Sequence, residues 1–335
     1  MKKATIYDVA ARAGVSHQTV SRVLNNHPSL KPATREKVEK AIADLMYRPS
    51  QAARQLVTSK SEMIGMIVAD TNLYGPTSIR NAMENEIRND GYTATSVSFR
   101  QEDRDSWVEG VEHLRNINIE GLITVALPKA IVDEVAKRIP NAVLVVVHSE
   151  PSNKLDLVNI DNVQGGRIAT DHLISLGHKK IFHVTGPKDA YESQMRQQGY
   201  EESMKEAKLK IQTIQGDWSI ESGYKIGLKI AEMKDRPTAI FCANDHQTLG
   251  LLKALSLKKV RVPADISIVG FDDIPESEFF STSLTTVRQD FEELGKIAVT
   301  RLLSQLKEKQ KPSLQLIEPT LIARDSTQQL KTGKR

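Results

Sequence analysis

Residues 15–25, VSHQTVSRVLN, combine an apolar stripe with a face rich in hydrogen-bonding side chains. Val15, Val20, Val23 and Leu24 recur at helical spacing. The other face carries one positive charge and no acid: His17, Gln18, Thr19, Ser21, Arg22 and Asn25. Amide and guanidinium groups can bond base edges in pairs, and hydroxyl groups can bond phosphates. The segment predicts a helix that contacts nucleic acid, although an ordinary exposed polar helix has the same pattern.

The charge of the chain is unevenly distributed. Residues 1–60 hold eleven Lys or Arg and four Asp or Glu, a net charge of +7. Because the whole chain carries +4, the remaining 275 residues sum to −3. A basic head on a mildly acidic body predicts that the head binds a polyanion, with a solvated basic surface as the alternative.

Short helices with clear ends are predicted in this head. Thr5 and Asp8 have the spacing of a capping box, so a helix is expected to begin there and to end before Gly14. Ser16 can cap a second helix that runs to about Asn26. Two helices separated by a tight glycine turn predict a helix-turn-helix domain, whose second helix enters the major groove of DNA.

A third helix and a bridge complete the head. Pro32 suits a first helical position, and Pro49 is expected to end the helix that follows. We therefore expect the helix-turn-helix domain to span residues 1–49 and a hinge or linker to span 50–60. The hinge segment SQAARQL is too short to be a stable helix alone, so it is expected to order against a partner.

Beyond residue 61 the pattern changes to short apolar runs that alternate with amphipathic helices. The runs cover residues 63–70, 92–99, 121–126, 142–147, 180–186, 211–217, 239–245 and 267–273. This alternation predicts an α/β body with parallel sheets covered by helices. A body of this length is large for one sheet, so two lobes are expected.

Several classes of protein find no support in the sequence. Apolar runs are too short to span a bilayer, no secretory signal opens the chain, and the single cysteine, Cys242, forms no internal disulfide, so a cytoplasmic protein is expected. Neither a nucleophile elbow nor a phosphate-binding loop motif is present. His172 and His178 have no third metal ligand suggested nearby. We expect no enzyme activity, no cofactor and no metal, and Cys242 is expected in the core.

Motifs along almost the whole chain resemble the lactose-repressor family of transcriptional regulators. They are TIYDVAARAGVSHQTVSRVLN, HLISLGHKKIFHVTGP, GDWSIESGY, PTAIFCANDHQTLG, PADISIVGFDD and LTTVRQDFEELG. The resemblance implies a helix-turn-helix head and a two-lobed body like the periplasmic sugar-binding proteins. The expected first lobe is 61–160 with 291–318, the second lobe is 161–290 with 319–327, and residues 328–335 are a polar tail.

The head is expected to divide its contacts with DNA between bases and backbone. His17, Gln18 and Arg22 are expected at base edges, with Gln18 suited to adenine and Arg22 to guanine. Contacts with the phosphate backbone are expected from Thr5, Tyr7, Ser16, Thr19, Ser21 and Asn25. Leu56 is expected to wedge into a minor-groove step, as the family's paired hinge helices do, or else to pack on its own domain.

The body is expected to bind a sugar between its lobes. Trp218 can stack on the apolar side of a pyranose, while Arg196, Asn244 and Asp272 can bond ring hydroxyls. The last two also suit a turn and a helix cap, and a lone Trp is commonly a core residue. The resemblance adds an apolar wall and residues near the crossing between lobes: Leu73, Pro76, Ile79, Gln289 and Phe291.

Three positions depart from the pattern that the resemblance implies. His17 stands where tyrosine is expected, His148 where aspartate is expected, and Ile160 where an aromatic residue is expected. His148 and Ile160 are still expected to line the ligand site. The operator and the sugar are therefore expected to differ from those of the family pattern.

The expected function is repression of a sugar-utilisation operon, with a galactoside such as lactose as the leading effector class. Sugar binding would release a homodimer from double-stranded operator DNA, and the polar tail lacks the leucine heptads that pair dimers into tetramers. One alternative is a regulator whose DNA binding is strengthened by a purine or a phosphoprotein. Others are a sugar transport receptor and a glycosidase, which would need a second carboxylate opposite Asp272.

Overall fold

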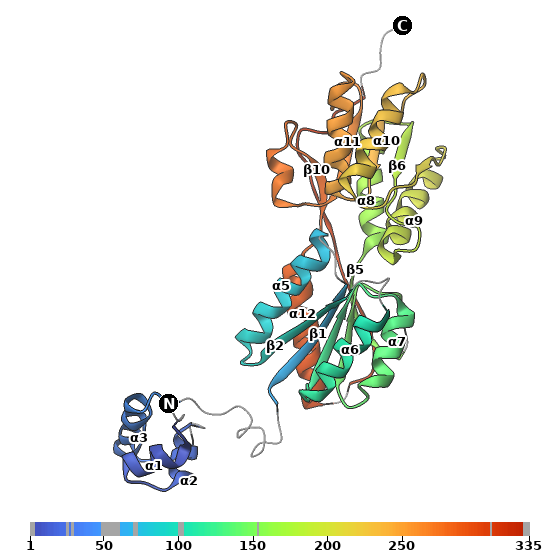
Figure 1. Ribbon diagram of the computed structural model, residues 1–335. Helices are drawn as coiled ribbons and strands as arrows, with labels where there is room; N and C mark the ends of the chain where they lie inside the picture. Colours follow the sequence, from blue (N-terminus) through green and yellow to red (C-terminus); the bar gives the residue numbers. More distant parts are fainter. Residues whose placement is uncertain are drawn as a thin grey trace. The chain divides into compact units, whose positions relative to one another are not determined.

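A computed structural model describes residues 4–24, 27, 30–47, 61–69, 73–99, 104–152, 154–308 and 310–330. The chain divides into two compact units, residues 1–61 and residues 62–335. The first is the all-α head and the second is the α/β body, as the sequence predicted (Figure 1). The predicted hinge at 50–60 lies outside the described residues.

The head contains α1 (Ile6–Ala13), α2 (His17–Leu24) and α3 (Pro32–Asp44). The predicted capping box is present, because the amide of Asp8 donates to Thr5 Oγ1 and the amide of Thr5 donates to Asp8 Oδ2. Gly14 ends α1 with a left-handed backbone, φ 66°. The three helices share one core, in which these side chains are buried: Val9, Ala10, Val20, Val23, Val38 and Ala41.

The first sheet of the body has the strand order β11-β5-β4-β3-β1-β2 and is parallel throughout. Its strands are β1 (Met63–Ala69), β2 (Thr93–Phe99), β3 (Gly121–Val125), β4 (Val143–Val147), β5 (Asp156–Ile160) and β11 (Leu314–Ile317). Helices α5 (Tyr74–Asn89) and α12 (Phe291–Lys307) pack on one face. Helices α6 (Arg104–Asn116) and α7 (Lys129–Arg138) cover the other face, and we call this sheet with its four helices the first lobe.

The second sheet has the order β12-β10-β9-β8-β6-β7, and only the β10–β12 pair is antiparallel among its described strands. Its strands are β6 (Ile181–Val184), β7 (Thr213–Ile214), β8 (Ala239–Cys242), β9 (Ser267–Asp272), β10 (Thr285–Arg288) and β12 (Thr320–Ile322). Helices α8 (Asn162–Ser175) and α9 (Tyr191–Glu206) cover one face. Helices α10 (Ile220–Glu232) and α11 (Asp245–Leu257) cover the other, and η1 (Pro275–Phe279) follows β9; this is the second lobe.

The chain crosses between the lobes more than once. It leaves the first lobe after β5, builds most of the second lobe, and returns to the first through α12 and β11 before β12 joins the second sheet. Each predicted apolar run forms a strand. The antiparallel β12 is the departure from the predicted parallel sheets, because a short link from Ile317 to Thr320 brings the last strand to the edge beside β10.

Candidate functional site

The side chains expected to contact bases lie on the exposed side of α2. His17, Gln18 and Arg22 are exposed, while Val20 and Val23 on the opposite side are buried in the head's core. The ring of His17 also contacts the ring of Tyr7 from α1, with centroids 5.2 Å apart. The amphipathic pattern of the sequence is therefore realised, with its polar face available to a partner.

The expected phosphate contacts have local roles as well. Ser16 Oγ accepts from the amide of Thr19 at 3.2 Å, so Ser16 caps α2 as its sequence position predicted. Thr5 likewise caps α1, and Tyr7 is 66% exposed. Ser21 is partly buried. The predictions for Asn25 and Leu56 fall outside the described residues.

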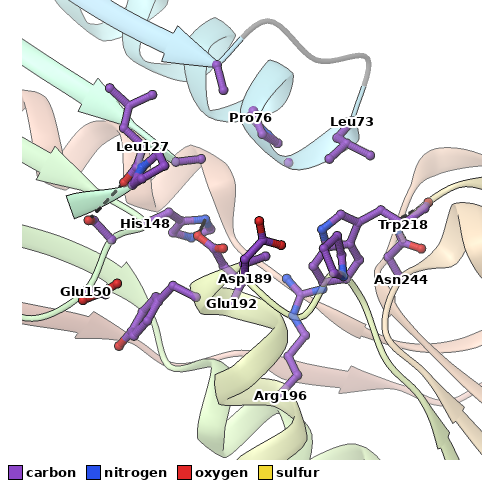
Figure 2. A pocket seen from close by; sticks show the side chains of 18 of the residues that line it. Leu73, Pro76, Leu127, His148, Glu150, Asp189, Glu192, Arg196, Trp218 and Asn244 are labelled. Atoms are coloured by element: carbon purple, nitrogen blue, oxygen red, sulfur yellow. Dashed lines mark hydrogen bonds and ion pairs between the residues drawn. The ribbon is translucent and has the colours of Figure 1, made fainter. Parts of the chain in front are cut away.

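A cavity of about 760 Å³ lies between the two lobes of the body (Figure 2). Its lining residues follow the carboxyl ends of strands in both sheets: β1, β3 and β4 in the first lobe, and β6 to β10 in the second. Carboxyl ends of parallel strands are where open α/β sheets bind ligands. The predicted ligand site at successive strand ends therefore coincides with a real cavity.

Eight of the residues predicted for the ligand site line this cavity: Leu73, Pro76, His148, Arg196, Trp218, Asn244, Asp272 and Gln289. Ile79, Ile160 and Phe291 are not among its lining residues in the described chain. All three are buried in the core between the first sheet, α5 and α12. The prediction that they line the cavity is corrected. Ile79 packs on its own sheet. The ring of Phe291 makes edge contacts with the rings of Tyr74 and His148, with centroids 5.8 Å and 6.3 Å apart.

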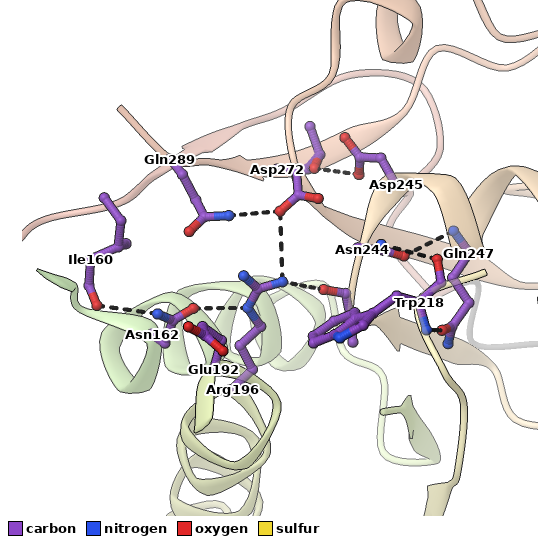
Figure 3. A network of polar contacts seen from close by, with 12 residues as sticks. Ile160, Asn162, Glu192, Arg196, Trp218, Asn244, Asp245, Gln247, Asp272 and Gln289 are labelled. Carbon is purple, nitrogen blue, oxygen red and sulfur yellow. Dashed lines mark hydrogen bonds and ion pairs between the residues drawn. The ribbon is translucent and has the colours of Figure 1, made fainter. Parts of the chain in front are cut away.

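Arg196 is the centre of a buried polar network (Figure 3). Its Nε donates to Asn162 Oδ1 at 2.8 Å and its Nη1 donates to the carbonyl of Ala243 at 2.6 Å. The same Nη1 lies 3.6 Å from Asp272 Oδ1, which also accepts from Gln289 Nε2 at 2.6 Å. Since Arg196 is 4% exposed and Asp272 7%, the pair compensates two charges that burial alone would disfavour.

Close packing of α8 on α9 fixes the backbone of Arg196. A Cβ added to Gly166 in α8 would lie 2.2 Å from the carbonyl oxygen of Arg196, so only glycine fits there. The guanidinium then lies over the ring of Phe271, 3.8 Å from its centroid. Both backbone and side chain of Arg196 are therefore fixed before any ligand binds.

Burial raises the pKa of Asp272 to about 6, although the charge of Arg196 and the hydrogen bond from Gln289 lower it. Asp272 ends β9 with φ 111°, a conformation that L-residues rarely adopt. The structure contains no helix cap at Asp272, so the alternative predicted from sequence is wrong for this residue. Its carboxylate faces the cavity and Arg196 instead.

Asn244 has both of the roles that the sequence left open. Its Oδ1 accepts from the amide of Gln247 and caps α11, as a turn residue would. Its Nδ2 donates to the carbonyl of Trp218 at 3.2 Å, and the side chain lines the cavity. Asn244 therefore ties the loop that carries Trp218 to the start of α11.

Trp218 lies at the cavity surface and is not a core residue. The guanidinium of Arg196 lies 5.1 Å from the centroid of its ring. Gly186 makes room for the indole, because a Cβ there would lie 2.4 Å from the ring. The indole is therefore held in position by the loops after β6 and β7.

Four of the described non-glycine residues with a positive φ line the cavity. Ala126, His148, Trp218 and Asp272 have φ between 53° and 111°, and all four line it. Such conformations are costly and persist where the surrounding structure imposes them, commonly at functional sites. This is independent support for a functional role of the cavity.

Several lining residues escaped the sequence analysis, above all Glu192 with its neighbours Asp189 and Tyr191. They belong to the segment GPKDAYES, which follows the apolar run 180–186. Their position after a strand was the signal that could have found them. Glu192 Oε1 lies 3.8 Å from Nδ1 of His148, which comes from the other lobe.

Other candidates from the sequence have structural roles. His172 Nε2 bonds Thr327 Oγ1, and His178 bonds Thr238 and Ser267, so both serve packing. Cys242 is buried, as expected. Within the described ranges, side chains do not gather into a group that could hold a metal ion, and none of the described helices is long and apolar enough to cross a membrane.

Comparison with known proteins identifies the class. Residues 5–50 match the bacterial regulatory proteins, lacI family, and residues 170–327 match the periplasmic binding protein-like domain. The chain is 33% identical over 333 residues to the lactose operon repressor of Escherichia coli K12, covering 98% of this chain and 91% of that one. It is 34% identical over 335 residues to the repressor PurR of Haemophilus influenzae, covering 98% and 99%.

Solved structures agree with these relatives. The lac repressor dimer bound to operator and the anti-inducer ONPF has a TM-score of 0.90 at 31% identity, covering 98% of this chain and 100% of that one. The regulator CelR in complex with cellobiose has a TM-score of 0.73 at 27% identity, covering 96% and 99%. The chain belongs to the lacI family of bacterial regulatory proteins. It is a DNA-binding transcriptional repressor of that family.

Proposed function

We propose that this repressor controls a sugar-utilisation operon and is released from its operator when a sugar, with galactosides as the first class to test, binds between the lobes. The supporting observation is the polar network of Arg196, Asp272 and Gln289 beside the indole of Trp218. An indole and an adjoining set of fixed polar groups suit the apolar and hydroxyl sides of a pyranose. Among the structural relatives, the lac repressor dimer is bound to the anti-inducer ONPF, and CelR is bound to cellobiose.

At the head, we propose that His17, Gln18 and Arg22 contact base edges of one operator half-site. Exposure of these side chains on one side of α2 supports this assignment. Two heads on a palindromic operator require a dimer, because the symmetry of the operator mirrors that of the protein. We therefore propose a homodimer that acts in the cytoplasm, where operator DNA is found.

Coupling between the two ligands follows from thermodynamics. If a sugar lowers the affinity for operator by some factor, operator lowers the affinity for sugar by the same factor. A sugar achieves this by binding the lobes better in one arrangement than in another. The lining residues come from both lobes, so a ligand that bridges them can favour one arrangement.

Titration of labelled symmetric operator with the protein, with and without a panel of galactosides and other sugars, tests the proposal. We expect at least one sugar to weaken operator binding at fixed salt. The result that would overturn the sugar assignment is operator binding that no sugar changes. A reciprocal test, in which saturating operator weakens sugar binding by the same factor, checks that both ligands act on one equilibrium.

The second candidate is a regulator whose effector strengthens DNA binding, as a purine would. The repressors named PurR, at 34% identity over 98% of this chain, favour keeping it. The same titration separates the two, since a corepressor tightens operator binding and an inducer weakens it. A transport receptor would need no DNA-binding head, and the head is present.

A glycosidase is the remaining alternative from the sequence. The cavity holds more carboxylates than expected, because Glu192 and Asp189 join Asp272. Asp272 is bonded to Gln289 and paired with Arg196, an arrangement that suits binding. We therefore propose no catalytic activity, and turnover of a chromogenic galactoside by pure protein would contradict this.

A further inference from the structure

Two polar side chains from opposite lobes meet in the cavity without completing each other's hydrogen bonds. His148 follows β4 of the first lobe, and Glu192 lies in the first turn of α9 in the second. We propose that His148 and Glu192 together bind a hydroxyl-bearing edge of the effector, and that Glu192 makes the cavity selective for uncharged effectors over anionic ones. This inference rests on the proposed function and specifies the chemical class of the ligand.

The pair has unused hydrogen-bonding capacity. His148 is 6% exposed, and its Nε2 is buried without a hydrogen-bond partner in the described chain. Glu192 Oε1 is likewise buried and unpartnered among the described residues, and so is Oε1 of Gln289 in the same cavity. Buried polar atoms normally find partners, so three unpartnered atoms around one cavity indicate groups that a ligand completes.

The imidazole of His148 is neutral at neutral pH. Burial lowers the pKa of His148 to about 3, and the charge of Arg196 acts in the same direction. The 3.8 Å contact between His148 Nδ1 and Glu192 Oε1 is therefore not an ion pair at neutral pH, and it is too long for a good hydrogen bond. Both groups remain available to a ligand that enters between them.

A hydroxyl group matches the donors and acceptors of this pair. One ring nitrogen of a neutral histidine donates and the other accepts, while an ionised carboxylate only accepts. A hydroxyl can donate to Glu192 and accept from His148, or bond His148 in its other tautomer by donating. Neighbouring hydroxyls on a sugar ring can therefore satisfy both residues at once.

Charge explains the selectivity that we assign to Glu192. Among the described residues, five carboxylates line the cavity: Glu150, Asp189, Glu192, Asp217 and Asp272. Its two cationic side chains are Lys129 and Arg196. Lys129 pairs with Asp133 at 2.9 Å, and Arg196 is already bonded to Asn162 and Ala243 and paired with Asp272. A phosphate or carboxylate on the effector would therefore meet excess negative charge.

Glu192 also occupies the place where an anion would be most favourable. The first turn of a helix attracts negative charge through its unpaired amides and its dipole. Glu192 lies in the first turn of α9. Burial raises the pKa of its carboxyl, while a hydrogen bond from its own backbone and the charge of Arg196 act in the opposite direction. Removing this charge should admit an anion to the end of α9.

Direct binding to the full-length protein tests the pair. The probes are methyl galactoside and methyl glucoside, with the matching uronic acids and hexose 6-phosphates, followed by calorimetry and tryptophan fluorescence. We expect wild-type protein to bind a neutral sugar more tightly than its anionic counterpart. Glu192→Gln should weaken the neutral sugar about 10-fold, in line with losing a charged hydrogen bond, and should strengthen the anion. Their affinity ratio should therefore fall by more than 10-fold.

Three controls separate the outcomes. Glu206→Gln, on the exposed side of the same helix, should leave the ratio unchanged. His148→Ala should weaken binding of the neutral sugar without changing the affinity ratio. Unchanged operator binding by each variant shows that the variant folds. If Glu192→Gln leaves both affinity and ratio unaltered while wild type binds the neutral sugar, the proposed function stands and the pair is overturned. If wild type binds none of the neutral sugars, the sugar assignment fails, and the pair fails with it.

Discussion

The two proposed sites of this repressor are built in opposite ways. On the head, the side chains proposed to contact base edges are exposed and project from one short helix, α2. In the body, Arg196, Asn244 and Asp272 are each at most 7% exposed and are bonded to neighbours or to each other. The proposed DNA site is an open surface that suits a large partner, whereas the proposed ligand site is an enclosed cavity that suits a small one.

Because of this difference, binding and stability depend on different side chains in the head but on the same side chains in the body. An exposed side chain can be removed from α2 with little effect on folding, because it has no buried partner to leave behind. A buried charge in the body cannot be removed without leaving another charge uncompensated. Substitutions of the exposed side chains on α2 should therefore affect only DNA binding, whereas substitutions in the buried network of the body should affect both ligand binding and stability.

The largest expected effect is that of Arg196→Ala. Loss of the guanidinium leaves Asp272 buried without its cation, which should cost about 3–5 kcal/mol of unfolding free energy. Sugar binding should become undetectable in the same variant. Urea denaturation and calorimetric titration measure the two losses. Arg167→Ala is the matched control, because its partners Glu202 and Glu206 are surface residues and the expected cost is below about 1 kcal/mol.

The next largest effect is expected in the head. Gln18→Ala should weaken operator binding and relax base preference at one position, at a cost of about 1–3 kcal/mol, because a paired contact with a base edge is lost. Sugar affinity and the unfolding free energy should not change. Titration of operators with single base changes measures this loss. Equal weakening on every operator would show that Gln18 contacts the backbone, contrary to the proposal.

Sugar affinity should fall as the pH drops below about 6, the raised pKa of Asp272. A hydroxyl that donates to Asp272 favours the ionised carboxylate, so protonation opposes binding, by up to about tenfold per pH unit. The sign for stability is the reverse: a raised pKa adds stability at low pH that is lost as the pH rises through 6. Calorimetric titration across this range checks the trend in affinity. Asp272→Asn should reduce the slope, and an unchanged slope would show that another group titrates.

The smallest effect should come from the ion pair between Arg12 and Asp44, which joins α1 to α3 in the head. Both side chains are substantially exposed, so a double-mutant cycle with Arg12→Ala and Asp44→Ala should give a coupling of about 0.2–1 kcal/mol. Thermal unfolding of the four proteins measures it. A coupling as large as the loss expected for Arg196 would break the contrast between exposed and enclosed sites.

The parts of the fold that could be predicted are those set by interactions between residues close together in the sequence. Caps and breakers act within a few residues, so Thr5, Asp8, Gly14 and Ser16 placed the first two helices correctly. Apolar runs predicted eight strands in the same way. Strands β5 and β10 to β12 were not recognised among these runs, and two of them, β11 and β12, occupy sheet edges where the burial pattern is weak.

The sequence by itself determined the helix-turn-helix head, the two-lobed α/β body and eight of the residues that line the cavity. The head and the strands follow from capping and periodicity, which are local properties of the chain, whereas part of the ligand site was implied by the resemblance to the lactose-repressor family. Only the tertiary structure decided that Ile79, Ile160 and Phe291 lie in the core and that Glu192 faces His148 from the opposite lobe. Such contacts join residues far apart in the chain, and their geometry is set by how helices and sheets pack.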